Sequence, residues 1–330
     1  MGQNHKLLTL LIFNIFFNHS SFAQKGYLDE VLKIVETHSI KRDSLDFKKI
    51  KKEAYKKLTS VNSIEDCYPI VRFILSELHD NHSFLMERAQ VDKWKSTSKS
   101  TYFAQPPTPF TGKVLDNEIG YIHMEGFSSG DSISIQEYAS ELQNLIRSID
   151  SKNIKGWILD LRQNTGGNCW PMLTGLGPLL GNGICGYFID NNHNKSSWYY
   201  KDGEAGVNSV ALSRIKNVPY KLVKEENPIA VLTGSWTASS GEVIVTSFRG
   251  KANTKSFGES TAGLSTGNSD YTLSDGSMIF LSTTIYADRN GNSYGGKIKP
   301  DIVENFENGK INFDNDPVIK RAIDWIIGSK

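Results

Sequence analysis

The chain has 330 residues, of which 38% are hydrophobic and 11% aromatic, so it can bury a sizeable core in one large or two modest domains. It carries 37 basic and 36 acidic residues, which gives a formal net charge of +1. This balance gives no electrostatic basis for nucleic acid or an anionic membrane as the main partner.

Residues 1–23 have the pattern of a secretory signal peptide. Lys6 supplies the positive start, Leu7 to Phe17 the apolar segment, and Ser21-Phe-Ala23 a small-residue cleavage site. About 11 apolar residues are too few to span a bilayer as an anchor. No cysteine follows the apolar segment to take up a lipid, and no second long apolar run follows Gln24. We therefore expect an exported protein, periplasmic or extracellular, with no membrane contact in its mature form.

Residues 24–90 are expected to form a small helical domain. The segment 46–58 is basic on one face, and the segment 63–78 begins with a cap-like Ser63 and carries apolar residues at helical spacing. The basic face is interpreted as solvated surface. Residues 91–113 are polar and contain prolines, which predicts a linker and the domain boundary.

Residues 114–330 alternate short apolar strands with helices. Strands are expected at 119–124, 156–161, 185–189, 228–232 and 278–287, and helices at 134–149, 170–180, 239–248 and from Pro317 onward. A Pro at the first helical position favours the last of these starts. Such alternation predicts an α/β layer architecture.

Three cysteines remain after the predicted cleavage, Cys67, Cys169 and Cys185. Their spacing matches no metal motif, and three cannot all pair within one chain. We expect small buried side chains, with a Cys169–Cys185 bridge as the alternative. The sequence thus predicts neither a cysteine nucleophile nor a metal site.

The segment most relevant to chemistry is 233–242, Thr-Gly-Ser-Trp-Thr-Ala-Ser-Ser-Gly-Glu, which follows an apolar strand. A hydroxyl at a helix start lies beside free backbone amides, so Ser239 could attack a carbonyl while neighbouring amides receive the oxyanion. The alternative is a capping box, in which Ser239 and Glu242 only cap the helix.

Three further segments carry polar residues in turn-like contexts: 160–167 (Asp-Leu-Arg-Gln-Asn-Thr-Gly-Gly), 78–83 (Leu-His-Asp-Asn-His-Ser) and 294–302 (Tyr-Gly-Gly-Lys-Ile-Lys-Pro-Asp-Ile). Adjacent glycines allow positive φ and expose amide donors. Each segment alone has an ordinary alternative: a strand-to-helix turn, a structural histidine, or a turn into an edge strand.

Together and in this order, these segments resemble the tail-specific or C-terminal processing family of serine peptidases. The matching elements are Asp80–Ser83, Asp160–Gly167, Thr237–Glu242, Gly258–Gly263 and Gly296–Ile302, spread over about 220 residues. The resemblance implies an α/β, ClpP/crotonase-like core of stacked βα units over 114–330 with a small helical N-terminal domain. Its closest branch is that of the tricorn core and the retinoid-binding-protein modules.

Carried over by resemblance, the nucleophile falls on Ser239 and the base on His82. The amides of Ser240 and of the Gly166-Gly167 turn would hold the oxyanion. The other branch of the family uses a Lys where this chain has Leu264, which argues against a Ser–Lys mechanism.

The group that orients His82 is left open by the resemblance, because Tyr294 stands at the family's Glu position. Glu259, Asp80 and Tyr294 are the candidates, with Glu259 preferred as a carboxylate in a loop near the nucleophile. Only about 35 residues separate Ser83 from Ile119, too few for the PDZ domain that many relatives insert there.

The resemblance therefore implies a secreted or periplasmic serine endopeptidase that hydrolyses polypeptides and needs no metal or organic cofactor. One alternative is a catalytically weak or inactive member that acts as a peptide or apolar-ligand binding module. Another is an acyl-CoA enzyme of the crotonase type, which a signal peptide and the presence of Ser239 argue against. The oligomeric state stays open.

Overall fold

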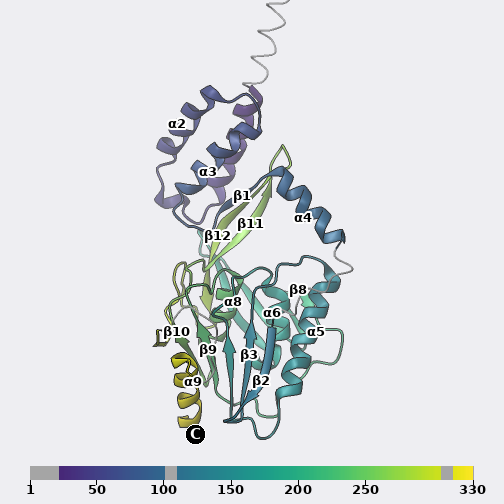
Figure 1. The fold of residues 1–330 in the computed structure, drawn as a ribbon. Coiled ribbons are helices and arrows are strands. Elements are labelled where there is room, and N and C mark those ends of the chain that lie inside the picture. Colours follow the sequence, from purple (N-terminus) through teal and green to yellow (C-terminus); the bar gives the residue numbers. More distant parts are fainter. Residues whose placement is uncertain (1–21, 101–109, 306–314, 330) are drawn as a thin grey trace, which may run out of the picture. The chain divides into compact units, whose positions relative to one another are not determined.

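The computed structural model describes residues 22–100, 110–305 and 315–329. The chain forms two compact units (Figure 1), the first made of Met1–Thr97 with Asn268–Thr283, and the second of Ser98–Gly267 with Thr284–Lys330. We call them the helical unit and the core unit. Most of the predicted signal peptide lies outside the described residues, so that prediction stays untested.

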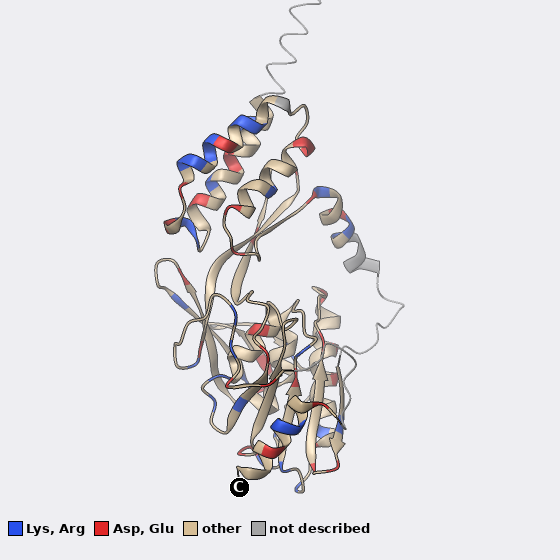
Figure 2. Cartoon of the chain, turned by 60° about the vertical axis from the view of Figure 1, so that its left-hand side comes forward, with Lys and Arg blue, Asp and Glu red and all other residues tan. Residues whose placement is uncertain are grey.

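The helical unit contains a helix over residues 22–38, then α2 (Phe47–Lys57) and α3 (Tyr68–Ser76), with short 3-10 turns between them. Asp46 caps α2 by accepting a hydrogen bond from the amide of Lys49 (3.1 Å). Apolar residues at helical spacing meet in one buried cluster, which includes Leu28, Leu32, Ile50, Val71 and Ile74. Basic and acidic residues are interspersed on these helices (Figure 2).

Strands from distant parts of the sequence also belong to the helical unit, which the sequence did not predict. β1 (Phe84–Met86) pairs antiparallel with residues 278–280 of β12 (Met278–Asp288), and β11 (Thr266–Thr272) also pairs with β12. The side chains of Leu273, Ile279 and Leu281 complete the cluster of the helical unit.

The expected linker at 91–113 is partly regular structure. Helix α4 (Arg88–Ser100) occupies its beginning, and β2 (Phe110–Leu115) occupies its end. A polar sequence with few apolar positions gives little helical periodicity to detect. Here Arg88 and Asp92 form an i,i+4 ion pair (3.7 Å) along the helix, a local source of support.

The core unit is built on a six-stranded sheet of order β13-β10-β9-β4-β3-β2 (Figure 1). Its strands are β2, β3 (Ile119–Met124), β4 (Gly156–Asp160), β9 (Ile229–Thr233), β10 (Thr254–Gly258) and β13 (Ile302–Val303). All neighbours are parallel except β2, which forms an antiparallel pair with β3. Parallel strands joined through helices confirm the predicted α/β core.

Helices cover both faces of this sheet. One side packs against α5 (Ser132–Ile149), α6 (Cys169–Gly175), α7 (Gly177–Leu180) and α8 (Ser240–Phe248). The other side packs against α9 (Pro317–Gly328). Successive residues of a strand point to opposite faces, so Ile158 joins the α9 cluster and Leu159 the larger one. The carboxyl ends of β4 and β9 lead directly into the two turns described below.

A second, antiparallel sheet in the core unit runs from residues 284–288 of β12 through β5 (Gly183–Asp190), β6 (Lys195–Lys201), β7 (Glu204–Val207) and β8 (Val210–Arg214). The sequence predicted β5 and β12 but not β6 to β8. The β6–β7 connection is Asp202-Gly203, both with positive φ (45° and 85°), which matches the twist of a tight hairpin.

Candidate active site

Ser239 lies at the N-cap of α8, in a backbone conformation that capping does not require. Its φ is +51° and its ψ is −116°. An N-cap residue ordinarily has extended dihedrals, and a non-glycine residue at positive φ is strained by about 1–3 kcal/mol. A serine on a sharp strand-to-helix turn is the arrangement that exposes the nucleophile of serine hydrolases.

The capping contact is also present. The amide of Ser239 donates to Glu242 Oε2 (2.9 Å), and the amide of Glu242 donates to the carbonyl of Ser239 (2.8 Å). The two readings of the Ser-x-x-Glu pattern are therefore compatible, because Glu242 can hold the helix start while the strained Ser239 presents its hydroxyl.

Glu242 is fully buried and ties the Ser239 turn to the loop after β10. Its Oε1 accepts hydrogen bonds from Thr261 Oγ1 (2.5 Å) and from the amide of Gly263 (3.1 Å). The amide of Ala262 donates to the carbonyl of Thr237 (2.9 Å), which adds a second link. Burial raises the pKa of Glu242, and the hydrogen bonds from Thr261 and Ser239 oppose that rise.

The glycine turn after β4 packs directly on the Ser239 turn. Gly166 and Gly167 have φ values of +99° and +113°. A Cβ on Gly166 would lie 2.9 Å from Ser239 Cβ and 3.0 Å from the amide nitrogen of Ser240, so no larger residue fits without movement. The hydroxyl of Ser240 donates to the carbonyl of Gly167 (2.5 Å). The two predicted turns are thus in contact.

The predicted oxyanion donors are the backbone amides of Gly166, Gly167 and Ser240, and they differ in whether another group already accepts their hydrogen. The Gly166 amide already donates to Asn164 Oδ1 (3.0 Å), so it is not free to receive an oxyanion. Within the described ranges, neither the exposed Gly167 amide nor the Ser240 amide has a hydrogen-bond acceptor. Unsatisfied donors at a helix start attract negative charge. Of the two glycines, only Gly167 therefore remains a candidate oxyanion donor, beside Ser240.

Asn164 holds both turns, a role that the sequence did not assign to it. This fully buried side chain accepts from the Gly166 amide and donates through Nδ2 to the carbonyl of Glu125 (3.2 Å). Its own carbonyl accepts the amide of Ala238 (3.0 Å), next to Ser239. A Cβ on Gly241 would lie 2.6 Å from that carbonyl, so a glycine is needed there.

The charged residues of the Asp-Leu-Arg element are buried and structural. Arg162 binds Asp160 through Nε (2.9 Å) and Nη2 (2.6 Å), and binds Asp316 through Nη1 (2.6 Å). Asp316 also caps α9. Tyr121 completes the network by donating to Asp160 (2.7 Å). A paired, hydrogen-bonded ion cluster of this kind fixes the end of β4, where the glycine turn begins.

His82 belongs to the helical unit, whereas Ser239, Ser240 and the glycine turn belong to the core unit. Its loop is folded by Asp80, whose carboxylate accepts the amides of His82 (3.0 Å) and Ser83 (2.9 Å) and the hydroxyl of Ser83 (2.5 Å). Asn268 Nδ2 donates to the carbonyl of His82 (2.9 Å). The backbone that carries the predicted base is therefore well defined.

The three candidates for orienting His82 differ in what already binds them. Asp80 is occupied by its own loop, and the hydroxyl of Tyr294 donates to Asp288 (2.9 Å). Glu259 is half-buried, its amide donates to the carbonyl of Thr233 (3.0 Å), and its carboxylate has no hydrogen bond or ion pair within the described residues. Glu259 is thus the candidate with a free carboxylate.

The three cysteines are buried and form no disulfide, as expected for small buried side chains rather than a Cys169–Cys185 bridge. Burial raises the pKa of Cys67 to about 11 and that of Cys169 to about 12. Both therefore stay thiols at neutral pH, which suits packing rather than attack on a substrate.

Comparison with known proteins defines the class. The sequence profile of Peptidase family S41 matches residues 118–304, more than half of the chain. The chain therefore belongs to peptidase family S41, which confirms the predicted relationship to the C-terminal processing peptidases and supports a peptidase-type function.

Three relatives illustrate the match. A nisin-resistance protein of Lactococcus lactis subsp. lactis is 28% identical over 317 residues, covering 95% of this chain and 90% of the relative. The carboxy-terminal processing protease CtpA of Bacillus subtilis is 30% identical over 191 residues, 58% of this chain and 36% of that protein. The structure of a lipoprotein from Streptococcus agalactiae superposes with a TM-score of 0.71 at 28% identity, covering 93% of this chain and 97% of the other.

The described parts of the chain contain no helix long and apolar enough to cross a membrane.

Proposed function

We propose that this chain is an exported serine endopeptidase with Ser239 as nucleophile and His82 as general base. The observation that carries the proposal is the Ser239 turn: a serine at φ +51° with the acceptor-free amides of Gly167 and Ser240 beside it. A serine held at positive φ is costly for stability alone, and such strain concentrates at functional sites.

The mechanism is acyl transfer. His82 takes the proton from the Ser239 hydroxyl as its oxygen attacks the peptide carbonyl, and the amides of Gly167 and Ser240 hold the oxyanion. One such donor contributes roughly 3–4 kcal/mol to the transition state in comparable enzymes. His82 then protonates the leaving amine, and water hydrolyses the acyl-enzyme. Because the two residues belong to different units, the mechanism requires the units to bring the imidazole to the hydroxyl.

The substrate class proposed is polypeptide, in line with the family. A relative that spans nearly the whole chain is named for nisin resistance, so nisin is a sensible first peptide to assay. Export is proposed from the signal pattern of residues 1–23, and N-terminal sequencing of the secreted protein should begin at Gln24.

The deciding experiment is labelling of the mature protein with a fluorophosphonate, followed by peptide mapping, beside peptide hydrolysis. We expect the label on Ser239, and expect Ser239→Ala to lose labelling and roughly 10⁴-fold or more of its turnover. Ser235→Ala is the matched control, because this serine is exposed on the same turn and should leave activity unchanged. An unlabelled protein, or an active Ser239→Ala variant, would reject the proposal.

The second candidate is a peptide or apolar-ligand binding module of the same fold. The specific observation in its favour is that Tyr294 stands at the family's Glu position and its hydroxyl is already bound to Asp288. A binding module would retain peptide affinity while showing neither fluorophosphonate labelling nor turnover.

A further inference from the structure

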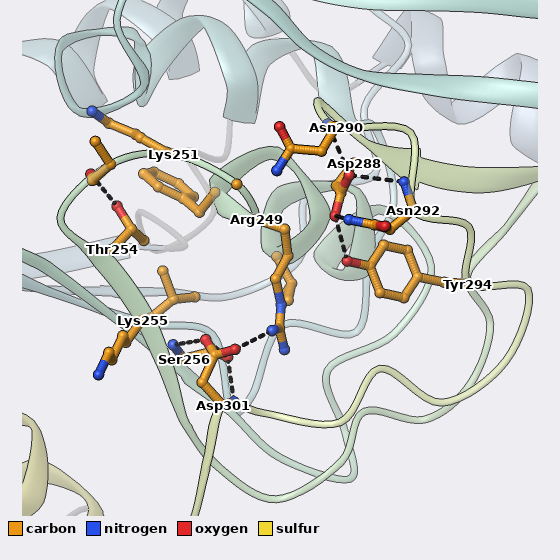
Figure 3. Close-up of a pocket in the computed structure, with 15 residues that line it drawn as sticks. Arg249, Lys251, Thr254, Lys255, Ser256, Asp288, Asn290, Asn292, Tyr294 and Asp301 are labelled. Atoms are coloured by element: carbon orange, nitrogen blue, oxygen red, sulfur yellow. Dashed lines mark hydrogen bonds and ion pairs between the residues drawn. The ribbon is translucent and has the colours of Figure 1, made fainter.

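A cavity of about 650 Å³ lies in the core unit at the C-terminal end of α8 (Figure 3). We call it the α8 pocket. Its lining combines polar residues and glycine with a few apolar side chains: Arg249, Gly250, Lys251, Thr254, Lys255, Ser256, Asp288, Asn290, Asn292, Tyr294 and Asp301, with Val231, Val245, Phe248 and Ala252. Its volume is typical of small-molecule sites. The nine residues of α8 span about 14 Å, so the pocket is separate from the Ser239 turn at the other end.

Both carboxylates of the pocket already have protein donors on both oxygens. Asp288 accepts the amides of Asn290 (2.9 Å) and Asn292 (3.0 Å), the side-chain amide of Asn292 (3.0 Å) and the hydroxyl of Tyr294 (2.9 Å). Burial would raise the pKa of Asp288, but these hydrogen bonds outweigh it and lower the pKa. A bound cation would therefore find no free lone pairs there.

Both carboxylate oxygens of Asp301 also have protein partners. It accepts the amide (2.7 Å) and the hydroxyl (2.8 Å) of Ser256 and forms an ion pair with Arg249. Arg249 also donates to the carbonyl of Lys299, so its charge is used within the protein. Each acidic group of the pocket is therefore already engaged by the protein, and Arg249 retains only its buried Nε without an acceptor among the described residues.

The lysines of the pocket have no such partners. Within the described residues, Lys251 and Lys255 form no ion pair, and Lys255 only lies over the ring of Trp325 (5.8 Å to its centroid). Lys251 is half-buried, and burial together with the charge of Arg289 lowers its pKa, while Glu225 opposes that change. A half-buried ammonium without a direct ion pair costs stability unless something compensates it.

The last carbonyls of α8 do not supply that compensation. Arg289 donates to the carbonyl of Ser247 (2.8 Å), and the backbone amide of Lys251 donates to that of Phe248 (3.3 Å). The helix end is thus capped by other groups, and the Lys251 side chain remains available to the pocket.

The pocket also contains a neutral donor, the carboxamide of Asn290. In Figure 3 Asn290 lies beside the chain that carries Arg249 and Lys251, and its carboxamide has no hydrogen bond within the described residues. A Cβ on Gly250, which has φ +73°, would lie 2.5 Å from Asn290 Nδ2. Only glycine at 250 lets this amide lie over the chain next to Lys251.

We propose that the α8 pocket binds a small organic anion through a carboxylate or phosphate group, with Lys251 as the counter-charge and Lys255 and Asn290 as further donors. Carboxylates engaged by protein donors, an ammonium without an ion pair and a carboxamide without a hydrogen bond in one cavity select an anionic ligand over a cationic one. None of the pocket's residues belongs to the Ser239 turn, and the one residue it shares with the proposed peptidase chemistry, Tyr294, has its hydroxyl bound to Asp288.

The test is isothermal titration of mature protein carrying Ser239→Ala, so that catalysis plays no part. The probes are inorganic phosphate and succinate at constant ionic strength held by sodium chloride. We expect saturable 1:1 binding of at least one, and the tighter probe identifies the phosphate or carboxylate chemistry. Lys251→Met should weaken binding about tenfold, as expected for loss of one charged hydrogen bond. Lys221→Met, a change at an exposed lysine outside the pocket, should have no effect.

Gly250→Ala provides a second test should Lys251→Met fold poorly, because the added methyl group must displace Asn290 and occupy a strained backbone. It should also weaken binding. The proposal is overturned if neither probe binds saturably, or if Lys221→Met weakens binding as much as Lys251→Met.

Discussion

The Ser239 turn and the Asp80–Ser83 loop carry the proposed nucleophile and base, yet their stabilising contacts differ in how much comes from within the segment. The turn is held by residues far away in sequence, with Asn164 on one side and Thr261 on the other. The loop is folded mainly by its own Asp80, whose three hydrogen bonds reach no farther than Ser83, with distant contacts from Asn268 and Ser282. Substitution of residues that support the turn should therefore affect both folding and catalysis. Substitution of the histidine in the loop should affect catalysis and leave folding nearly unchanged.

His82→Ala should produce the largest loss short of removing the nucleophile, roughly 10³-fold or more in kcat with little change in melting temperature. A histidine base also predicts that activity rises with pH through about 6–7. Steady-state kinetics and thermal melts at several pH values measure both.

His79→Ala is the matched control, because His79 is exposed and only three residues away. If the His79 variant loses activity and the His82 variant keeps it, the base is misassigned. Activity that keeps climbing far into alkaline pH would indicate a lysine base instead.

Asn164→Ala tests the turn itself. Loss of Oδ1 leaves the buried Gly166 amide without its acceptor, so the glycine turn can move. Displacement of the Gly167 amide from the proposed oxyanion position should lower kcat about 100-fold with a small effect on KM. The unpaired amide should also cost about 1–3 kcal/mol of folding free energy.

The control for this variant is Asn168→Ala. Asn168 lies in the same segment and caps α6 (3.1 Å to the Trp170 amide), but it contacts neither Gly166 nor Ala238. We expect it to lose about 1 kcal/mol of stability and almost no activity. Equal kcat losses in the two variants would mean that Asn164 has no special positioning role.

The same contrast between local and distant contacts explains what the sequence could predict. β3 falls on the predicted residues, and α9 begins at the predicted Pro317, because periodicity and caps are local signals. α4 was missed because a polar helix shows little periodicity. β6 and β7 were missed although Asp202-Gly203 is a recognisable hairpin signal between them.

For the candidate site, the sequence motifs located the glycine turn and the Ser239 turn. They did not identify the residues that hold these turns in place. Arg162 could not be assigned from the sequence because one of its partners, Asp316, follows 154 residues later. The role of Asn164 depends on a side-chain hydrogen bond to the Gly166 amide and on contact with Gly241 in another turn. No spacing rule reports such contacts.

Glu259→Gln should have a more moderate effect, about a tenfold loss in turnover with little change in melting temperature, if its free carboxylate orients His82. Tyr294→Phe is the comparison, and its hydroxyl is already committed to Asp288, so we expect a smaller loss. Both variants remove a polar function and preserve shape. A large loss in Tyr294→Phe alone would assign the orienting role to the phenol.

Glu242→Gln should produce the smallest effect, a change in how stability depends on pH. Burial raises the folded-state pKa of Glu242, so between its ordinary pKa of about 4.3 and the raised value the native state binds more protons than the unfolded state. Stability from this group is therefore lost as pH rises through that window and is constant above it. The neutral Gln variant lacks this term. We expect its melting temperature, relative to the parent, to increase from about pH 4 upward and then level off. If the melting temperatures of the two proteins instead changed with pH in parallel, Glu242 would have the same pKa in the folded and unfolded states. The hydrogen bonds from Ser239, Thr261 and Gly263 would then fully offset the effect of its burial.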